Sequence, residues 1–174
     1  MNKNFRKTNT GIFPYNREFA YIYAKRWALD RNPKYYDFEN IGGDCTNFAS
    51  QVIHAGGCPM NDTKWTGWYY YSLQNRAPAW TSVEYLFKYL TTNNGRGPIS
   101  VISSINDIEI GDIIQLNFGF DEKFDHTPVV VRIEEPRKPE NIFIAAHTYD
   151  RFDYPLSNYN YVDIRFIHIL GYKF

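Results

Sequence analysis

Apolar residues in the first half of the chain recur three or four positions apart, which is the spacing of an amphipathic helix. Asn16 suits the N-cap of the first predicted helix, and Thr81 with Glu84 three residues later forms a capping-box pattern at the start of the third. The three predicted helices cover residues 17–29, 46–55 and 81–90.

Beyond Gly95 the pattern changes to alternation or to short apolar runs rich in Ile, Val and Phe, which favours strands. The predicted strands cover residues 112–118, 127–133, 142–147 and 164–170. A helical first half followed by a run of strands predicts an α+β fold, with N-terminal helices packed on one side of an antiparallel sheet.

Two segments lie outside this pattern. Residues 1–14 have no periodic apolar face, and we interpret them as an N-terminal arm of the kind that is often disordered, which leaves residues 15–174 as a single domain. Residues 59–80 are an aromatic loop insertion with three of the four Trp. Trp65, Trp68 and Tyr69 could line a ligand cleft or belong to the core, and both interpretations stay open.

Charge and hydropathy exclude several classes of protein. The 19 basic and 19 acidic residues among 174 give a formal charge of +0, which argues against a nucleic-acid partner because phosphate binding needs a basic surplus. The longest apolar run is about five residues, so we expect no transmembrane segment and find no signal peptide. The protein is extracellular or at the cell envelope if a leader has been removed, and otherwise cytoplasmic.

The two cysteines are predicted to be unpaired, because a helix of about 15 Å separates them while a disulfide needs Cα atoms within about 7 Å. Cys45 stands at the first turn of that helix, behind Gly42, Gly43 and the capping candidate Asp44. Free N–H groups and the helix dipole at this end favour a thiolate, so we expect a lowered pKa. The same N–H groups could stabilise an oxyanion. Cys58 is expected to have no chemical role.

A nucleophilic thiol needs a base, and four histidines compete for that role. His54 lies about 13 Å along the same helix and cannot reach Cys45, and His168 shares the apolar face of the last strand. His126 opens one predicted strand and His147 closes the next, so antiparallel pairing would bring them side by side. We expect Cys45, His126 and His147 to form a triad, with Asp150 as the rival for the third role.

Other site chemistries find less support in the residue pattern. A zinc site from the cysteines and histidines would lack any paired spacing, so we expect neither a metal nor another cofactor. The paired carboxylates of a glycosidase stay open, but nothing singles out two acids among the 19.

Several motifs together resemble the putative amidase domain of Gram-positive bacteria, from about Tyr15 to the end of the chain. They are Gly42–Gln51 (GGDCTNFASQ), Ala55–Gly57 (AGG), Trp68–Tyr70 (WYY), Gly111–Leu116 (GDIIQL), His126 and Ala146–Asp150 (AHTYD). That domain belongs with the papain-like cysteine hydrolases and is akin to the NlpC-type and CHAP cell-wall peptidases.

The resemblance implies Cys45 as nucleophile, His126 as base and His147 as the third polar residue, with Tyr36 and Asp44 as candidates for an oxyanion or substrate contact. It implies a monomeric hydrolase that cleaves amide bonds of peptides or peptidoglycan through an acyl-enzyme. Two alternatives stay open: a wall- or glycan-binding module without catalysis, and a cysteine acyltransferase.

Overall fold

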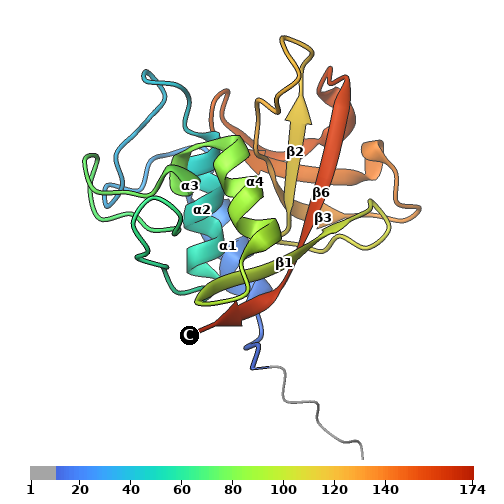
Figure 1. Ribbon diagram of the computed structural model, residues 1–174. Helices are drawn as coiled ribbons and strands as arrows, with labels where there is room; N and C mark the ends of the chain where they lie inside the picture. The colour runs from blue at the N-terminus through green and yellow to red at the C-terminus, as the bar shows by residue number, and fades with distance from the viewer. Residues whose placement is uncertain (1–10) are drawn as a thin grey trace, which may run out of the picture.

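The computed structural model describes residues 11–174, and its centre is a six-stranded sheet whose neighbouring strands are all antiparallel (Figure 1). The strand order across the sheet is β1-β6-β2-β3-β4-β5, so the last strand in the chain lies between β1 and β2. The strands are β1 (Gly97–Ser103), β2 (Ile113–Asn117), β3 (Val129–Ile133), β4 (Ile142–Ala146), β5 (Arg151–Pro155) and β6 (Asp163–Lys173).

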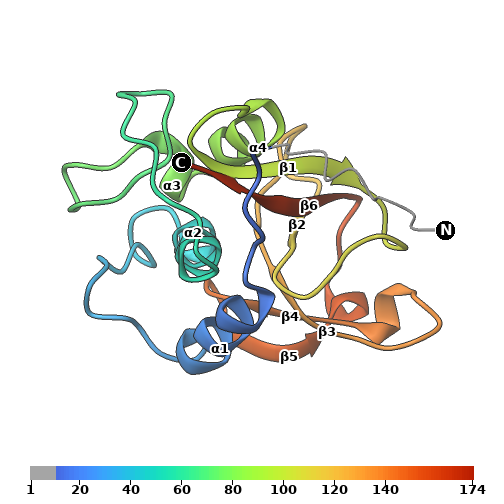
Figure 2. The ribbon, with the colours of Figure 1, turned by 90° about the horizontal axis from the view of Figure 1, so that it is seen from below.

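Four α-helices in the described part of the chain gather on one side of this sheet, as Figures 1 and 2 show from two directions. They are α1 (Arg17–Trp27), α2 (Cys45–Ala55), α3 (Pro78–Thr81) and α4 (Val83–Thr92), and two short 3-10 helices are η1 (Pro139–Asn141) and η2 (Leu156–Asn158). The arrangement confirms the predicted α+β class, with helices packed on an antiparallel sheet.

Each predicted helix differs from the observed one by one or two residues at an end, and the Asp44 side chain does not cap α2. Asn16 caps α1 as expected, since its side chain accepts a hydrogen bond of 3.0 Å from the Phe19 N–H. The third predicted helix is two helices, because Ser82 between them has extended backbone angles. The capping box is not formed, and the Glu84 carboxylate instead accepts hydrogen bonds from Arg165 and from the Phe124 N–H.

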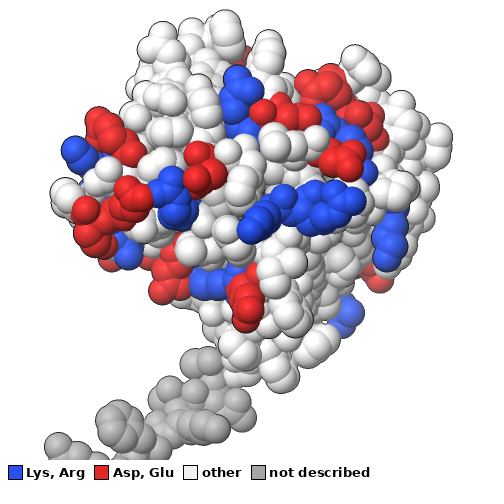
Figure 3. All heavy atoms as spheres, turned by 180° about the vertical axis from the view of Figure 1, so that it is seen from behind, with Lys and Arg blue, Asp and Glu red and all other residues white. Residues whose placement is uncertain are grey.

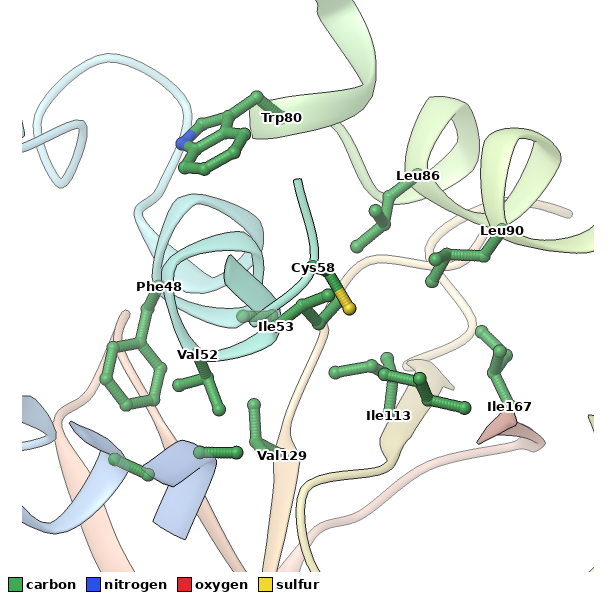
Figure 4. Packing of buried hydrophobic residues seen from close by; sticks show 14 of the residues in the cluster. Phe48, Val52, Ile53, Cys58, Trp80, Leu86, Leu90, Ile113, Val129 and Ile167 are labelled. Atoms are coloured by element: carbon green, nitrogen blue, oxygen red, sulfur yellow. The ribbon is translucent and has the colours of Figure 1, made fainter. Parts of the chain in front are cut away.

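The main core lies between the helices and the sheet (Figure 4). Almost the whole of α2 is buried, including Phe48, Val52 and Ile53, which pack toward strand residues such as Val129. A second cluster on the other face of the sheet contains Ile108, Ile114, Leu116, Val130, Ile142, Ile144, Ala146 and Leu156. The sheet is therefore buried on both faces, and α2 is held rigidly against one of them.

The aromatic insertion contributes three of its aromatic side chains, Trp68, Tyr70 and Trp80, to the core. Trp68 and Trp80 are fully buried with ring centroids 4.8 Å apart, and their indole N–H groups donate to Ser50 and Asn47 of α2 at 3.0 and 2.9 Å. Trp65 is 70% exposed. Of the two interpretations that the sequence left open, core packing holds for Trp68, and the insertion braces the side of α2.

The ends of the described chain lie together at one edge of the sheet. Phe13 pairs with Tyr172 through backbone hydrogen bonds of 2.8 and 3.0 Å. Of the predicted arm, residues 1–10 lie outside the described residues, whereas Phe13 is attached to β6. None of the helices within residues 11–174 has the length and hydropathy needed to cross a membrane.

Acidic and basic side chains intermingle on the face opposite to that of Figure 1, and neither sign forms one continuous patch there (Figure 3). Ion pairs join residues far apart in the chain, as in the contacts of Arg132 with Asp153 and of Arg17 with the buried Asp112. The zero net charge of the sequence thus corresponds to a mixed surface on this face.

Candidate active site

Cys45 is the first residue of α2 and is placed there by a tight loop. Gly42 and Gly43 have φ values of 111° and 94°, a left-handed region that favours glycine. A Cβ atom on Gly43 would lie 3.0 Å from the Thr148 hydroxyl, so the loop passes too close to the β4–β5 turn for a larger residue. Because the first bond within α2 joins the Phe48 N–H to the Asp44 carbonyl, the Cys45 N–H lies ahead of the helical hydrogen bonds.

The Cys45 thiol is 6% exposed and lines a cleft of about 330 Å³. Four segments form the cleft: the loop and first turn of α2, the end of the aromatic insertion at Arg76, the junction of α3 with α4, and the loop before β3. The lining residues are Phe38, Ile41, Gly42, Gly43, Cys45, Thr46, Arg76, Thr81, Ser82, Val83, Glu84, Lys123, Phe124 and Asp125. A larger hollow of about 450 Å³, between α1 and the outer strands, is lined by no cysteine, serine, threonine or histidine.

The structure brings the segment of His126 against the first turn of α2. The hydroxyl groups of Thr46 and Thr127 are 3.0 Å apart, and the Thr127 backbone also hydrogen-bonds the Cys45 sulfur. His126 itself is anchored to β2 by backbone hydrogen bonds with Leu116. The residue next to the predicted base therefore touches the predicted nucleophile.

Tyr159 is the hydrogen-bond partner of His126 at the other side of the ring. Its hydroxyl lies 3.2 Å from His126 Nε2, and its ring packs 5.3 Å from the imidazole. Burial raises the pKa of Tyr159, so the phenol stays protonated. No sequence motif pointed to Tyr159, which comes from the segment just after η2.

Burial dominates the protonation of both reactive groups. It raises the pKa of the Cys45 thiol, although hydrogen bonds from Thr127 and Thr46 act in the opposite direction. It lowers the pKa of His126 to about 4. The expected lowering of the thiol pKa by the helix terminus is therefore outweighed, and near neutral pH the structure favours a neutral Cys45 thiol and a neutral His126 imidazole.

The structure places His147 away from His126, which corrects the predicted triad. His147 Nδ1 lies 2.5 Å from Asp44 Oδ2, Nε2 lies 2.8 Å from the Trp27 carbonyl, and the ring stacks on Phe48 at 4.2 Å. Both ring nitrogens are thus engaged elsewhere. The physical reason is the alternation of side chains along strands: His147 points toward the helices, whereas His126 packs with Phe118 and Tyr159 on the opposite face.

The β4–β5 turn instead supports the loop that carries Cys45. The Asp44 N–H donates to the Thr148 hydroxyl at 2.8 Å, and the Asp44 carboxylate is bound by His147. Asp150 forms two hydrogen bonds of 3.0 Å with Arg31, so it is not a partner of His126 either. His147 and Asp150, the two candidates for the third triad residue, therefore both form contacts within or next to the loop that carries Cys45.

Other predicted contacts also find a structural place. The Asp44 carboxylate accepts hydrogen bonds from the Phe38 N–H and from Asn47, so its Oδ1 is engaged within the fold and not with a ligand. Tyr36 is 43% exposed, packs against Phe38 and does not line the cleft. Within residues 11–174, no three His, Cys, Asp or Glu side chains are arranged to hold a metal ion.

Trp65, Trp68 and Tyr69 do not line the cleft that contains Cys45. Trp68 is part of the core, and Tyr69 stacks near Tyr71 at a centroid distance of 5.6 Å. Trp65 borders a separate hollow of about 230 Å³ beside α4. These aromatic side chains are therefore placed to pack or to cover α4 and not to contact a substrate at Cys45.

Comparison with known proteins gives a family match and two bacterial relatives. Residues 14–170 match the family model described as "Putative amidase domain". The chain is 32% identical over 140 residues to the uncharacterized protein YhbB of Bacillus subtilis (strain 168), covering 79% of this chain and 43% of that protein. It is 25% identical over 155 residues to the uncharacterized protein YjcM of the same strain, covering 85% of this chain and 34% of that protein.

The chain thus spans less than half the length of either relative. No solved structure matches it.

Proposed function

The chain belongs to the family of the putative amidase domain, and on this premise we propose that it is a cysteine-dependent amide hydrolase of the papain-like kind. The family description points to hydrolysis of a C–N bond. The observation that carries the cysteine mechanism is the contact of the Thr127 backbone with the Cys45 sulfur, which sets the nucleophile beside the His126 segment at the floor of a cleft.

The proposed reaction begins from the neutral pair. His126 takes the proton of the Cys45 thiol as the sulfur attacks the substrate carbonyl, so an S–C bond forms and the carbonyl electron pair moves to oxygen. The C–N bond then breaks, and the imidazolium gives its proton to the leaving amine. Water, deprotonated by His126, hydrolyses the thioester and restores the thiol.

We assign the positioning of His126 to Tyr159. With the Nε2–H donated to the phenol oxygen at 3.2 Å, Nδ1 is left without a proton and can accept the one from Cys45. This arrangement fixes the tautomer in the way that a third polar residue does in hydrolytic triads. The Cys45 N–H, which precedes the helical hydrogen bonds, is the proposed donor to the oxyanion.

The proposed substrate is an amide bond in peptidoglycan peptides. Support comes from the resemblance of the motif around Cys45 to those of NlpC-type and CHAP cell-wall peptidases. The cleft of about 330 Å³ is lined by four chain segments, between which part of a peptide could bind beside Cys45. The binding-module alternative has less support, because Trp68 and Trp80 of the insertion pack against α2, although Trp65 is exposed.

The test compares wild type with Cys45→Ser on purified Gram-positive peptidoglycan, with new amino groups as the readout. Cys58→Ala is the matched control, since Cys58 is the other free thiol and lies in the core. We expect wild type and Cys58→Ala to release amino groups and Cys45→Ser to release none. Release by Cys45→Ser at the wild-type rate would exclude a cysteine mechanism. Faster capture of the acyl group by an added amine than by water would indicate an acyltransferase.

A further inference from the structure

Two basic side chains in the cleft have no acidic partner within the described residues. Arg76 and Lys123 both line the cleft with Cys45, and neither forms an ion pair within residues 11–174. The two acids of the cleft are bound: Glu84 contacts Arg165 at 2.9 Å, and Asp125 accepts a hydrogen bond of 2.9 Å from the Phe118 N–H. The Asp125 carboxylate has no cationic partner within residues 11–174, so two unpaired cations stand against one unpaired carboxylate and the excess charge of the cleft is positive.

Arg76 is held in position before any ligand arrives. Its Nη1 donates to the Leu73 carbonyl, its Nε lies 3.3 Å from the Thr81 hydroxyl, and its guanidinium lies 4.6 Å from the centre of the Phe38 ring. The remaining nitrogen, Nη2, has no hydrogen-bond partner within the described residues. A fixed guanidinium with a free donor suits a carboxylate, and fixing it in advance reduces the entropy lost on binding.

We infer that Arg76 is a specificity-determining residue that binds a substrate carboxylate close to the scissile amide, so that the cleft prefers acidic peptides over their neutral amides. Lys123, an exposed residue that also lines the cleft, adds to the positive field that attracts such peptides. This inference rests on the proposed function only where it names a scissile amide. The preference for binding a carboxylate depends on Arg76 and the cleft, and not on catalysis.

The preference can be measured without turnover. The experiment uses Cys45→Ala, which cannot form an acyl-enzyme, and two N-acetylated, C-amidated tripeptides that differ only in Glu or Gln at the centre, Ala-Glu-Ala and Ala-Gln-Ala. Loss of a charge-assisted hydrogen bond typically weakens binding roughly ten- to hundredfold. We therefore expect Kd for the Glu peptide to be at least about tenfold lower than for the Gln peptide, with a gap that narrows as salt is added.

Substitution of Arg76 separates a binding role from a structural one. In the Cys45→Ala background, Arg76→Gln should bring the two Kd values together by weakening the Glu peptide alone, and Arg76→Lys should keep part of the difference. Lys88→Gln is the charge-matched control, because it removes an exposed cation of α4 outside the cleft and should leave the preference intact.

Two results for Cys45→Ala with Arg76 unchanged would overturn the inference: equal Kd values for the Glu and Gln peptides, or no binding of either peptide. An equal weakening of both peptides by Arg76→Gln would also overturn it, because that result is the mark of a structural residue. Failure of the proposed function has a different signature: wild type releases no amino groups from peptidoglycan while the Glu preference in binding persists.

Discussion

Burial of His126 should make the protein lose stability in mild acid. The imidazole is 4% exposed, and burial lowers its pKa from 6.5 to about 4. Between these two values the unfolded chain binds a proton that the folded chain does not, so the free energy of unfolding falls as the pH falls. The separation of 6.5 − 4 = 2.5 pKa units corresponds to a loss of about 3 kcal/mol, most of it present by pH 4.

The measurement compares wild type with His126→Gln by urea unfolding from pH 7.5 to pH 4. The variant keeps a polar group beside Tyr159 but cannot take up this proton, and subtraction removes the contributions of the other three histidines and of the carboxylates. The free energy of unfolding of wild type, relative to the variant, should be about 2 kcal/mol smaller at pH 5 and about 3 kcal/mol smaller at pH 4 than at pH 7.5.

Two outcomes would refute this reasoning. A difference that stays constant with pH would mean that His126 binds protons equally in the folded and unfolded chains. A difference that grows in favour of wild type as the pH falls would mean that the folded imidazole holds its charge, as it would opposite a Cys45 thiolate. Repeating the urea series in the Cys45→Ala background tests for that ion pair. If the Cys45 thiolate keeps His126 charged, the growing difference should disappear in Cys45→Ala.

Three further changes test neighbouring parts of the site. Tyr159→Phe removes the hydroxyl 3.2 Å from His126 and should lower kcat/KM about tenfold. The free energy of unfolding in urea should change by no more than about 1 kcal/mol. An unchanged kcat/KM would remove Tyr159 from the mechanism. Asp44→Asn changes one partner of a hydrogen bond with His147 in which both side chains are 1% exposed, so it should cost about 2 kcal/mol at pH 7, and a loss below about 0.5 kcal/mol would show that the hydrogen bond is replaceable. Alkylation of Cys45 by iodoacetamide should still be rising above pH 8, because burial raises the thiol pKa, and a plateau from pH 5 would reveal a preformed thiolate.

The helices and the central strands could be predicted because their periodicity is local. The two strands that the sequence did not reveal, β1 and β5, lie at the edges of the sheet, where Val101 and Ile102 are exposed and Arg151–Pro155 has no buried residue. The break between α3 and α4 was also hidden. Thr81 and Glu84 have the spacing of a capping box, but the Glu84 carboxylate accepts a hydrogen bond from Arg165, which lies 81 residues later in the chain.

The nucleophile and the base have local signals, whereas the third residue does not. Strand pairing does set the start of β3 beside the end of β4, since Val129 lies opposite Ala145. The prediction failed on the direction of the side chain: His147 shares the face of Ala145, toward α1 and α2, and His126 shares the other face. Tyr159 comes from a separate segment with no motif, so only the assembled fold shows that it reaches His126.

The hydrogen bond between Thr46 and Thr127 joins positions 81 residues apart, one from the helical half of the chain and one from the sheet. In the proposed mechanism, a nascent chain that ends after the helical half contains Cys45 but not His126. The Cys45 thiol then has no base and is not a catalyst. Activity would appear only after β3 and β6 have paired with β2. An enzyme that attacks peptide bonds would gain from this order of events, because its own unfinished chain is never exposed to a working catalyst of the same molecule.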